Sequence, residues 1–381
     1  MQKHFFVMNA SRPDPAHVAN GASHGEAPLH GAIVFSPCVR GRVRGIDATR
    51  ARQAPGVVAV VLAGDVTGER WPGEVDRERP GLVAVGDEVR CVGDALALVA
   101  AHTEEEAWRA AAMVDLVCDP LTPVLSAHDA LSPDAPRVNP MHSNLVARAV
   151  LTRGNAASTL AMSAFVASGS WRSLQPEAPR GMSALAVPSR GGLEIVTRDV
   201  DDKAHAEVAR FLAMPDGAVR FVALDGAARD VSHELPMHEY SALLARILRR
   251  PVRISLDVTG AARLCPAPRP VDMEYELGCD ADGRLTALRA RFVADSGAYA
   301  TVSHTTLEHA VSVSCGPYRV SSVDVEAYAV CTNHPPADAS LGFDDAQVSF
   351  ALERCLDLLA TKAHLDPELL RVRNGPEANA A

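Results

Sequence analysis

The stretch Leu29-His30-Gly31-Ala32-Ile33-Val34-Phe35 is the first part of the chain with a clear secondary-structure pattern. Its short apolar run, ended by Ser36-Pro37, predicts a buried strand followed by a turn. Residues 42–46 alternate between polar and apolar side chains, which predicts a half-buried strand, and residues 47–51 suit a short helix capped by Asp47. These first elements predict a fold that mixes strands with helices.

The next segments continue the same mixture. Pro55-Gly56 turns the chain into the β-branched run 57–62, and further strands are expected at 88–92 and 95–101. Thr103-Glu104-Glu105-Glu106 then caps a helix that runs to residue 113. Together these elements predict one α+β unit that ends near residue 131.

The second part of the chain has similar patterns. Strands are expected at 161–187, 192–198, 219–224, 252–257, 273–277 and 285–295, and helices at 203–213 and 238–249. Between the two parts, residues 132–158 are rich in turn-forming residues and indicate a connection. We therefore expect a loose, aperiodic arm over 1–25, a first domain over 26–131, a linker over 132–158 and a second α+β domain over 159–381.

The composition narrows the class of protein. The chain has 381 residues, 48% of them hydrophobic, which is enough apolar surface for two or three domain cores. Its net charge of −10, with Lys and Arg spread singly, argues against a surface that follows nucleic-acid phosphates. The apolar stretch at the N-terminus breaks at Asn9, which is too short for a membrane span or the core of a signal peptide. We therefore expect a cytoplasmic, globular protein that binds neither nucleic acid nor membrane.

The sequence carries no motif for a metal or a phosphate. Its eight cysteines are scattered without a CxxC pair, which predicts reduced, mostly buried thiols rather than an iron-sulfur cluster or a structural zinc site. His233 and His238 lie five residues apart, a spacing that does not place two ligands on one helical face. Residues 169–173 lack the closing glycine of a nucleophile elbow. We expect no metal site.

Several segments together carry a family resemblance. They are Leu29–Val34 with Ser36-Pro37 and Ile46-Asp47; Ala54–Val58 running to Gly64-Asp65; Val89–Asp94; and Tyr318–Val320 leading to Thr332-Asn333 and Gly342-Phe343. They resemble the molybdopterin-binding large subunit of the xanthine dehydrogenase and aldehyde oxidase family, and Asp295-Ser296-Gly297-Ala298-Tyr299 supports the same match. The resemblance covers roughly residues 26–374. It implies an α+β fold, with an a/b hammerhead domain followed by the first half of a molybdenum-cofactor-binding α+β domain.

The resemblance also implies a chemistry. Members of this family use water to hydroxylate an electron-poor carbon of a heteroaromatic ring or an aldehyde, and electrons pass through molybdenum to iron-sulfur clusters. In the family, the last segments matched here lie near the middle of the large subunit. We therefore expect the second half, with the family's catalytic glutamate, to come from another chain if a complete site forms.

The family's glycine-rich cofactor loop corresponds to Leu224–His233, where Gly226 is the one glycine. Glycines in such a loop let backbone N–H groups approach the pterin. Here Val231 is bulky, and the two aspartates of the loop would repel an anionic pyrophosphate. Glu234 follows the loop where some members have a substrate-orienting glutamate, so it is a candidate catalytic residue; the alternative is an exposed loop carboxylate.

A glutamine and a Met-Glu-Pro-Arg-Gly turn form a second family contact. The turn corresponds to Glu177–Gly181, but Ala178 has no carboxylate, and Arg172 stands where the glutamine is expected. Gln175 is three residues further along and therefore on the opposite face of a strand. We interpret Arg180-Gly181 as a structural turn.

Two further family contacts are altered. His309 occupies the position of a substrate-orienting arginine, and a histidine cannot form the permanently charged, bidentate fork of that side chain. It is a candidate catalytic residue, with a purely structural histidine as the alternative. In the loop of Ala-Phe-Arg-Gly-Phe-Gly type, Leu341 replaces the arginine, while Gly342, Phe343 and Gln347 persist. With Gly226, these three are candidates for cofactor binding; a core aromatic is the other interpretation of Phe343.

The scaffold segments are intact while all four cofactor contacts are altered. This contrast predicts a non-catalytic structural or regulatory partner in a molybdenum hydroxylase complex, inactive by itself and with little or no binding of the cofactor. Its partners would be a large subunit or the missing half, and iron-sulfur subunits with or without an FAD subunit. The alternative is one half of a split hydroxylase that oxidises a purine, aldehyde or N-heterocycle, with a second chain supplying the catalytic glutamate. A truncated gene product and an unrelated binding protein on the same scaffold also stay open.

Overall fold

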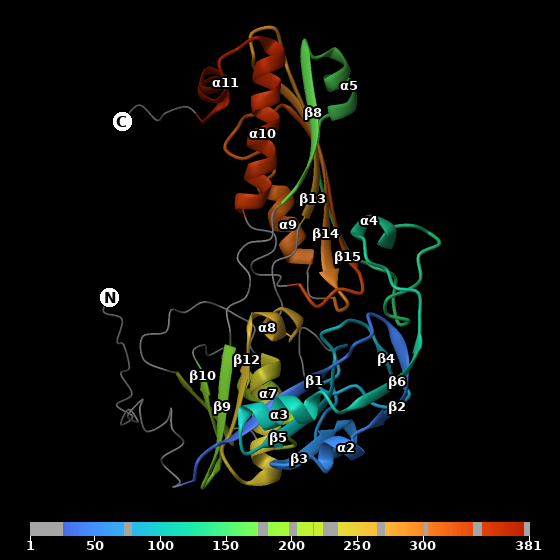
Figure 1. The fold of residues 1–381 in the computed structure, drawn as a ribbon. Coiled ribbons are helices and arrows are strands. Elements are labelled where there is room, and N and C mark those ends of the chain that lie inside the picture. Colours follow the sequence, from blue (N-terminus) through green and yellow to red (C-terminus); the bar gives the residue numbers. More distant parts are fainter. Residues whose placement is uncertain are drawn as a thin grey trace, which may run out of the picture.

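The computed structural model describes residues 26–71, 78–173, 182–197, 204–215, 217–223, 235–264, 271–300, 304–337 and 345–376. Figure 1 shows an upper part built around one sheet and a lower part built around two more sheets. Helices pack against the sheets in both parts, so the predicted α+β fold is confirmed. None of the described helices is long and apolar enough to cross a membrane.

A seven-stranded sheet organises the lower part. In spatial order its strands are β11 (Val219–Ala223), β10 (Gly192–Thr197), β9 (Met182–Ser189), β12 (Val252–Leu256), β1 (Leu29–Phe35), β5 (Ala95–Ala101) and β3 (Val57–Leu62). Strand β1 pairs antiparallel with β5 and parallel with β12, where Leu29 lies opposite Val252. One sheet therefore combines strands from residues 29–101 with strands from residues 182–256.

Helices cover both faces of this sheet. Those of the lower part are α2 (Thr49–Arg52), the 3-10 helix η2 (Ala63–Asp65), α3 (Glu104–Ala111), α6 (Ala204–Phe211), α7 (Leu235–Leu248) and α8 (Val258–Leu264). Successive side chains of a strand point to opposite faces. Leu29 and Ile33 of β1 accordingly join the core that contains α7, while Ala32 packs with Ala107 of α3.

A three-stranded sheet lies beside the larger one in the lower part (Figure 1). Its order is β4 (Glu88–Val89), β2 (Gly41–Asp47) and β6 (Asp115–Pro120), and both neighbours run antiparallel to β2. Val43 and Val89 are fully buried in a core shared with β5, so this sheet is packed firmly against the rest of the lower part.

A five-stranded sheet forms the upper part. Its order is β7 (Leu145–Arg153), β15 (Ser322–Cys331), β14 (Leu285–Gly297), β13 (Val271–Cys279) and β8 (Phe165–Arg172). The accompanying helices are α4 (Ala127–Ala130), α5 (Ala156–Met162), α9 (His304–Val313), α10 (Asp345–Ala363) and α11 (Pro367–Asn374). Met273 and Tyr275 of β13 point into the core with Leu352 and Leu356 of α10, and α10 runs along this face in Figure 1.

Most predicted elements are present with similar bounds, and three differ. The predicted connection over 132–158 contains β7, whose apolar residues pack beside β15, and the start of α5. Flanking turn residues hid both elements in the sequence. The predicted strand over 161–187 divides into the end of α5, β8 and β9. Asp47 is not the cap of α2: Ala48 is, and the Asp47 carboxylate accepts a hydrogen bond from the Thr49 N–H at 2.8 Å.

Candidate functional site

The structure describes only some of the predicted site residues. Gly226, Glu234, Gly342 and Phe343 lie outside the described residues, as does the 174–181 segment. His309 lies on the exposed side of α9, whereas Gln347 is 9% exposed in the first turn of α10. The two helices pack against each other, but these two side chains face different surroundings.

The described residues next to the 224–234 segment form a small buried cluster. The Nε2 atom of His238, near the start of α7, shares a hydrogen bond of 2.9 Å with the Thr197 hydroxyl at the end of β10. The Phe221 ring packs nearly perpendicular to the imidazole, with ring centroids 5.1 Å apart. Burial lowers the pKa of His238 to about 4, so the imidazole is neutral at physiological pH.

The start of α7 therefore offers no fixed positive charge. Its first two turns, residues 235–242, contain the neutral His238 and the buried Glu239 and neither lysine nor arginine. An anionic pyrophosphate is stabilised by cations and by free backbone N–H groups. The described side chains on this side of the segment do not fit such a group.

A second cluster joins segments that are far apart in the sequence. The Tyr299 hydroxyl donates a hydrogen bond of 2.8 Å to Oδ1 of Asp94, and the Arg90 backbone N–H donates one of 2.7 Å to Oδ2. Asp94 and Tyr299 are 2% and 0% exposed. Arg90 stacks over the Tyr299 ring at 5.6 Å and supplies a compensating positive charge. This buried network holds the turn after β4 against the end of β14.

Asn333 extends the same joint to a third segment. Its side-chain amide donates to the Arg90 carbonyl at 2.7 Å, and its carbonyl oxygen accepts from the Val124 N–H at 2.8 Å. The residue is 1% exposed. The segments Val89–Asp94, Asp295–Tyr299 and Thr332-Asn333 therefore meet at one place, which we call the joint. Sequence reasoning recognised all three segments but not that they contact one another.

A buried carboxylate fixes the neighbouring backbone. Asp295 accepts hydrogen bonds from the Thr332 hydroxyl at 2.7 Å, from the Gly297 N–H at 2.9 Å and from Nδ1 of His334 at 2.7 Å. Burial would raise the pKa of Asp295, but these hydrogen bonds outweigh it and lower the pKa below its usual value. The ionised carboxylate therefore holds Thr332 and His334 against the end of β14.

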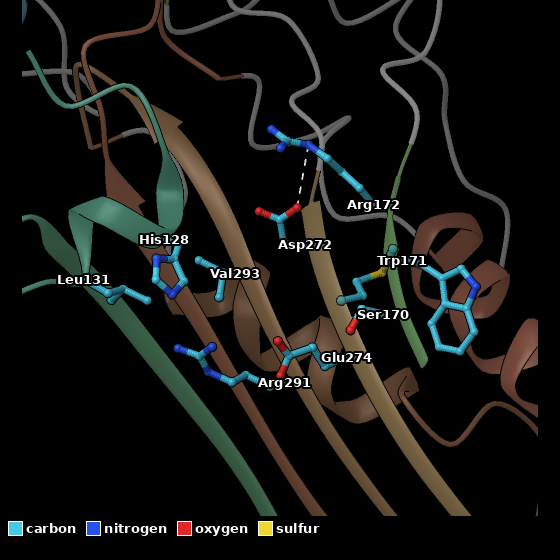
Figure 2. Close-up of a pocket in the computed structure, with 10 residues that line it drawn as sticks. His128, Leu131, Ser170, Trp171, Arg172, Asp272, Glu274, Arg291 and Val293 are labelled. Carbon is cyan, nitrogen blue, oxygen red and sulfur yellow. Dashed lines mark ion pairs between the residues drawn. The ribbon is translucent and has the colours of Figure 1, made fainter. Parts of the chain in front are cut away.

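Arg172 lies on the polar face of the five-stranded sheet. A hollow of about 320 Å³ lies on this face. In Figure 2, Arg172 and Asp272 lie at one end of its lining, and Glu274 and Arg291 lie further along the strands. The Arg172 Nε lies 3.6 Å from the Asp272 carboxylate, and their side chains are 67% and 42% exposed. Trp171 points to the opposite side, as expected of neighbouring residues in a strand (Figure 2). This position therefore presents a solvated ion pair and no glutamine amide.

The joint holds distant parts of this chain together. The polar groups of the joint are hydrogen-bonded to one another and buried, which is the arrangement of a structural contact. Within the described ranges no group of three or more His, Cys, Asp and Glu side chains could hold a metal ion.

Comparison with known families gives two matches that together cover most of the chain. A model of the molybdopterin cofactor-binding domain matches residues 141–375, and one of the aldehyde oxidase and xanthine dehydrogenase a/b hammerhead domain matches residues 20–122. A probable xanthine dehydrogenase subunit of Bacillus subtilis is 31% identical over 357 residues, which are 91% of this chain and 47% of that protein. The nicotinate dehydrogenase large molybdopterin subunit of Eubacterium barkeri is 27% identical over 361 residues, which are 92% of this chain and 83% of that protein.

Solved structures share the fold. The quinoline 2-oxidoreductase of Pseudomonas putida 86 aligns with a TM-score of 0.80 and 27% identity over 91% of this chain and 46% of its own. The aldehyde oxidoreductase of Desulfovibrio gigas aligns with a TM-score of 0.82 and 22% identity over 93% of this chain and 40% of its own. The chain thus spans about half the length of most of these proteins, and most of the length of the Eubacterium barkeri protein.

Proposed function

Because the chain belongs to the xanthine dehydrogenase and aldehyde oxidase family of molybdopterin-binding subunits, we propose that it is a non-catalytic partner in a molybdenum hydroxylase complex. It folds as a scaffold and contributes contacts, while another chain carries the cofactor chemistry. The observation that carries this proposal is that the described side chains beside the altered cofactor loop do not fit an anionic pyrophosphate, whereas the buried joint that holds the fold together is intact.

Three segments that resemble the family support the scaffold role. Asp94, Tyr299 and Asn333 come from different segments, and all three are buried and hydrogen-bonded across the joint. Removing any one of them would leave a polar partner buried without its hydrogen bond, which costs about 1–3 kcal/mol. Selection for a folded module would therefore preserve such residues independently of any cofactor.

The residues around the expected cofactor loop support the non-catalytic role. The 224–234 segment contains Asp225, Asp230 and Val231, and the adjoining helix has a neutral His238 in its first turn. These residues do not fit the anionic pyrophosphate of a pterin dinucleotide. We therefore assign the molybdenum cofactor of the complex to the partner chain and derive no chemical step from this one.

One observation favours the alternative of a split hydroxylase. The Eubacterium barkeri relative, of which this chain covers 83%, is named a large molybdopterin subunit. A chain of about this length can therefore be a molybdopterin subunit in the family. In that case a second chain would supply the catalytic glutamate, and the pair would oxidise a purine, an aldehyde or an N-heterocycle.

The molybdenum content of the purified complex distinguishes the two proposals. The tagged chain is expressed with its neighbouring genes and purified, molybdenum per mole is measured by elemental mass spectrometry, and co-purifying chains are identified. We expect no metal in the chain alone, and metal only when a large subunit with its own glycine loop and catalytic glutamate co-purifies. Near-stoichiometric molybdenum with only a half-length partner would establish the split hydroxylase, and the absence of any co-purifying subunit would contradict both proposals.

A further inference from the structure

A second hollow lies on the polar face of the five-stranded sheet, next to the one that Arg172 lines. Its volume is about 430 Å³, and its lining comes from four neighbouring strands, β8, β13, β14 and β15. Ser170, Glu274 and Arg291 line both hollows, and Figure 2 shows these three side chains on neighbouring strands. The two hollows therefore adjoin each other, and we call the second one the trough.

Two helices border the trough on the same face of the sheet. Ala287 packs with Ala156 and Leu160 of α5, and Val293 packs with residues of α4. Both helices lie on the side of the sheet opposite α10 (Figure 1). Ala287 and Val293 are six residues apart on β14, which corresponds to about 20 Å along the strand. Because a helix with its side chains is about 10 Å wide, α4 and α5 leave an opening of about 10 Å between them.

The strands of the trough carry charges of alternating sign. Carboxylates lie on β13 and β15, and guanidinium groups lie on β14 between them. The six residues are Glu274 and Glu276, Arg289 and Arg291, and Asp324 and Glu326. In the register, each arginine lies between two of the carboxylates. Neighbouring strands are about 4.8 Å apart, so a segment that crosses them meets negative, positive and negative charge at that interval.

Part of this charge is not paired within the described chain. Arg289 lies 3.5 Å from the Glu276 carboxylate and 3.9 Å from that of Asp324. Glu274 and Arg291 lie opposite each other, yet neither forms an ion pair with any residue that the structure describes. The Arg291 guanidinium instead lies over the Tyr328 ring at 5.4 Å. The trough therefore presents both signs of charge to an occupant, with carboxylates in excess.

We propose that the trough binds a helix of a second subunit, and that this helix presents a basic, an acidic and a basic side chain on one face. Positions i, i+3 and i+7 of a helix share a face and span about 10 Å along its axis, as do the strands β13, β14 and β15 across the sheet. A crossing strand would space the side chains of one face about 7 Å apart and would fall out of step with the charges. The opening between α4 and α5 is also one helix wide.

The inference rests on the proposed role of the chain as a partner subunit, and it names the surface that takes part. The excess of carboxylates selects an occupant that is basic on balance. The arginines of β14 exclude a uniformly basic helix, because its middle cation would lie over Arg291. A uniformly acidic helix would place carboxylates over Glu274 and Glu326, so the sign pattern is what selects the partner.

Binding of synthetic helices to the full-length chain tests the trough. The fluorescent, alanine-rich peptides have about 20 residues, enough for an isolated helix. The matched peptide carries Lys, Glu and Lys at i, i+3 and i+7; the reversed peptide carries Glu, Lys and Glu; the scrambled peptide has the composition of the matched one with its charges on different faces. Fluorescence anisotropy at low ionic strength should give the matched peptide a Kd about tenfold lower than either of the others.

One variant separates the sign pattern from the net charge. Arg291→Glu makes the protein more acidic, which by itself would strengthen the binding of a basic peptide. The trough predicts the opposite, a Kd for the matched peptide that rises about tenfold, because its central Glu then meets a carboxylate. Arg190→Glu is the matched control: it makes the same change of charge at an exposed residue between β9 and β10, and it should not raise the Kd. Circular dichroism verifies that both variants are folded.

Three results would overturn the proposal. The first is a matched peptide that binds no more tightly than the scrambled one, and the second is an Arg291→Glu variant that binds it as tightly as the unaltered chain. The third is a dimer of this chain, seen by light scattering, that Arg291→Glu dissociates, because a second copy would then fill the trough. If a large subunit co-purifies equally well with Arg291→Glu and with the unaltered chain, the trough is refuted while the role as a partner subunit stands.

Discussion

At the scale of single residues, the burial of His238 makes the free energy of unfolding depend on pH. Its folded-state pKa of about 4 lies below the usual value of 6.5, because burial disfavours the charged imidazole. The unfolded chain therefore binds more protons than the folded chain between these two pH values. We predict that the free energy of unfolding decreases by up to about 3 kcal/mol as the pH falls from 6.5 to 4.

Urea denaturation at several pH values measures this effect. His238→Gln keeps a side chain that can hydrogen-bond to Thr197 but does not titrate, so its stability should depend less on pH in this window. His128→Gln is the matched control, because the His128 side chain is 88% exposed and its removal should leave the pH dependence unchanged. Equal slopes for His238→Gln and the unaltered protein would contradict the assignment.

At the scale of elements, the joint depends on the close approach of the 90–94 turn to the end of α8. A Cβ atom at Gly93 would lie 1.9 Å from the Arg263 carbonyl oxygen, and a backbone atom cannot rotate away. We predict that Gly93→Ala destabilises the protein by about 1–3 kcal/mol, because α8 or the turn has to move. Thermal and urea unfolding measure the loss.

The control for this substitution is Gly64→Ala in η2, where a Cβ atom would meet nothing within 4 Å. It should change stability by no more than about 0.5 kcal/mol. If both variants lose the same amount, contact between the turn and α8 is not the cause of the loss, because the restriction of the unfolded chain by alanine would by itself stabilise the protein.

Element prediction succeeded where the local pattern was strong. The apolar run of β1 and the capping box of α3, in which Thr103 and Glu106 exchange hydrogen bonds, were both evident from adjacent residues. Prediction failed at β7, whose residues are mostly exposed or partly buried and whose ends lie among turn-forming residues. Pairing with β15 makes β7 a strand, and a local pattern does not contain that partner.

At the scale of the whole molecule, the two sequence parts share one sheet. Strand β1 lies between β5 and β12, so the first domain expected from the sequence, residues 26–131, contains only one of the two partners of β1. We predict that a fragment of residues 26–131 lacks a cooperative unfolding transition, because its β1 edge and the core beneath α7 are exposed. Circular dichroism during heating and size-exclusion chromatography measure this.

A fragment of residues 26–264 is the matched control. It retains every strand of the seven-stranded and three-stranded sheets, so it should unfold cooperatively, at a lower temperature than the full chain because Tyr299 and Asn333 of the joint are missing. A fragment of residues 26–131 that melts as sharply as residues 26–264 would show that the first part folds independently.

The candidate site was predictable only in part for the same reason. Family-like segments located Asp94, Tyr299 and Asn333 in the sequence, but their contacts join residues separated by most of the chain. Arg172 was identified as the replacement of a glutamine, and its ion pair with Asp272 became evident only when β8 and β13 were seen to be neighbours.

The sequence by itself determined the type of most elements, the family and the residue replacements at the expected cofactor positions, because each depends on residues that are adjacent in the chain. Only the tertiary structure decided that β1 lies between β5 and β12 and that three distant segments form the joint. The physical reason is that strand pairing and buried hydrogen bonds depend on partners far away in the chain, and these partners are chosen by packing of the whole molecule.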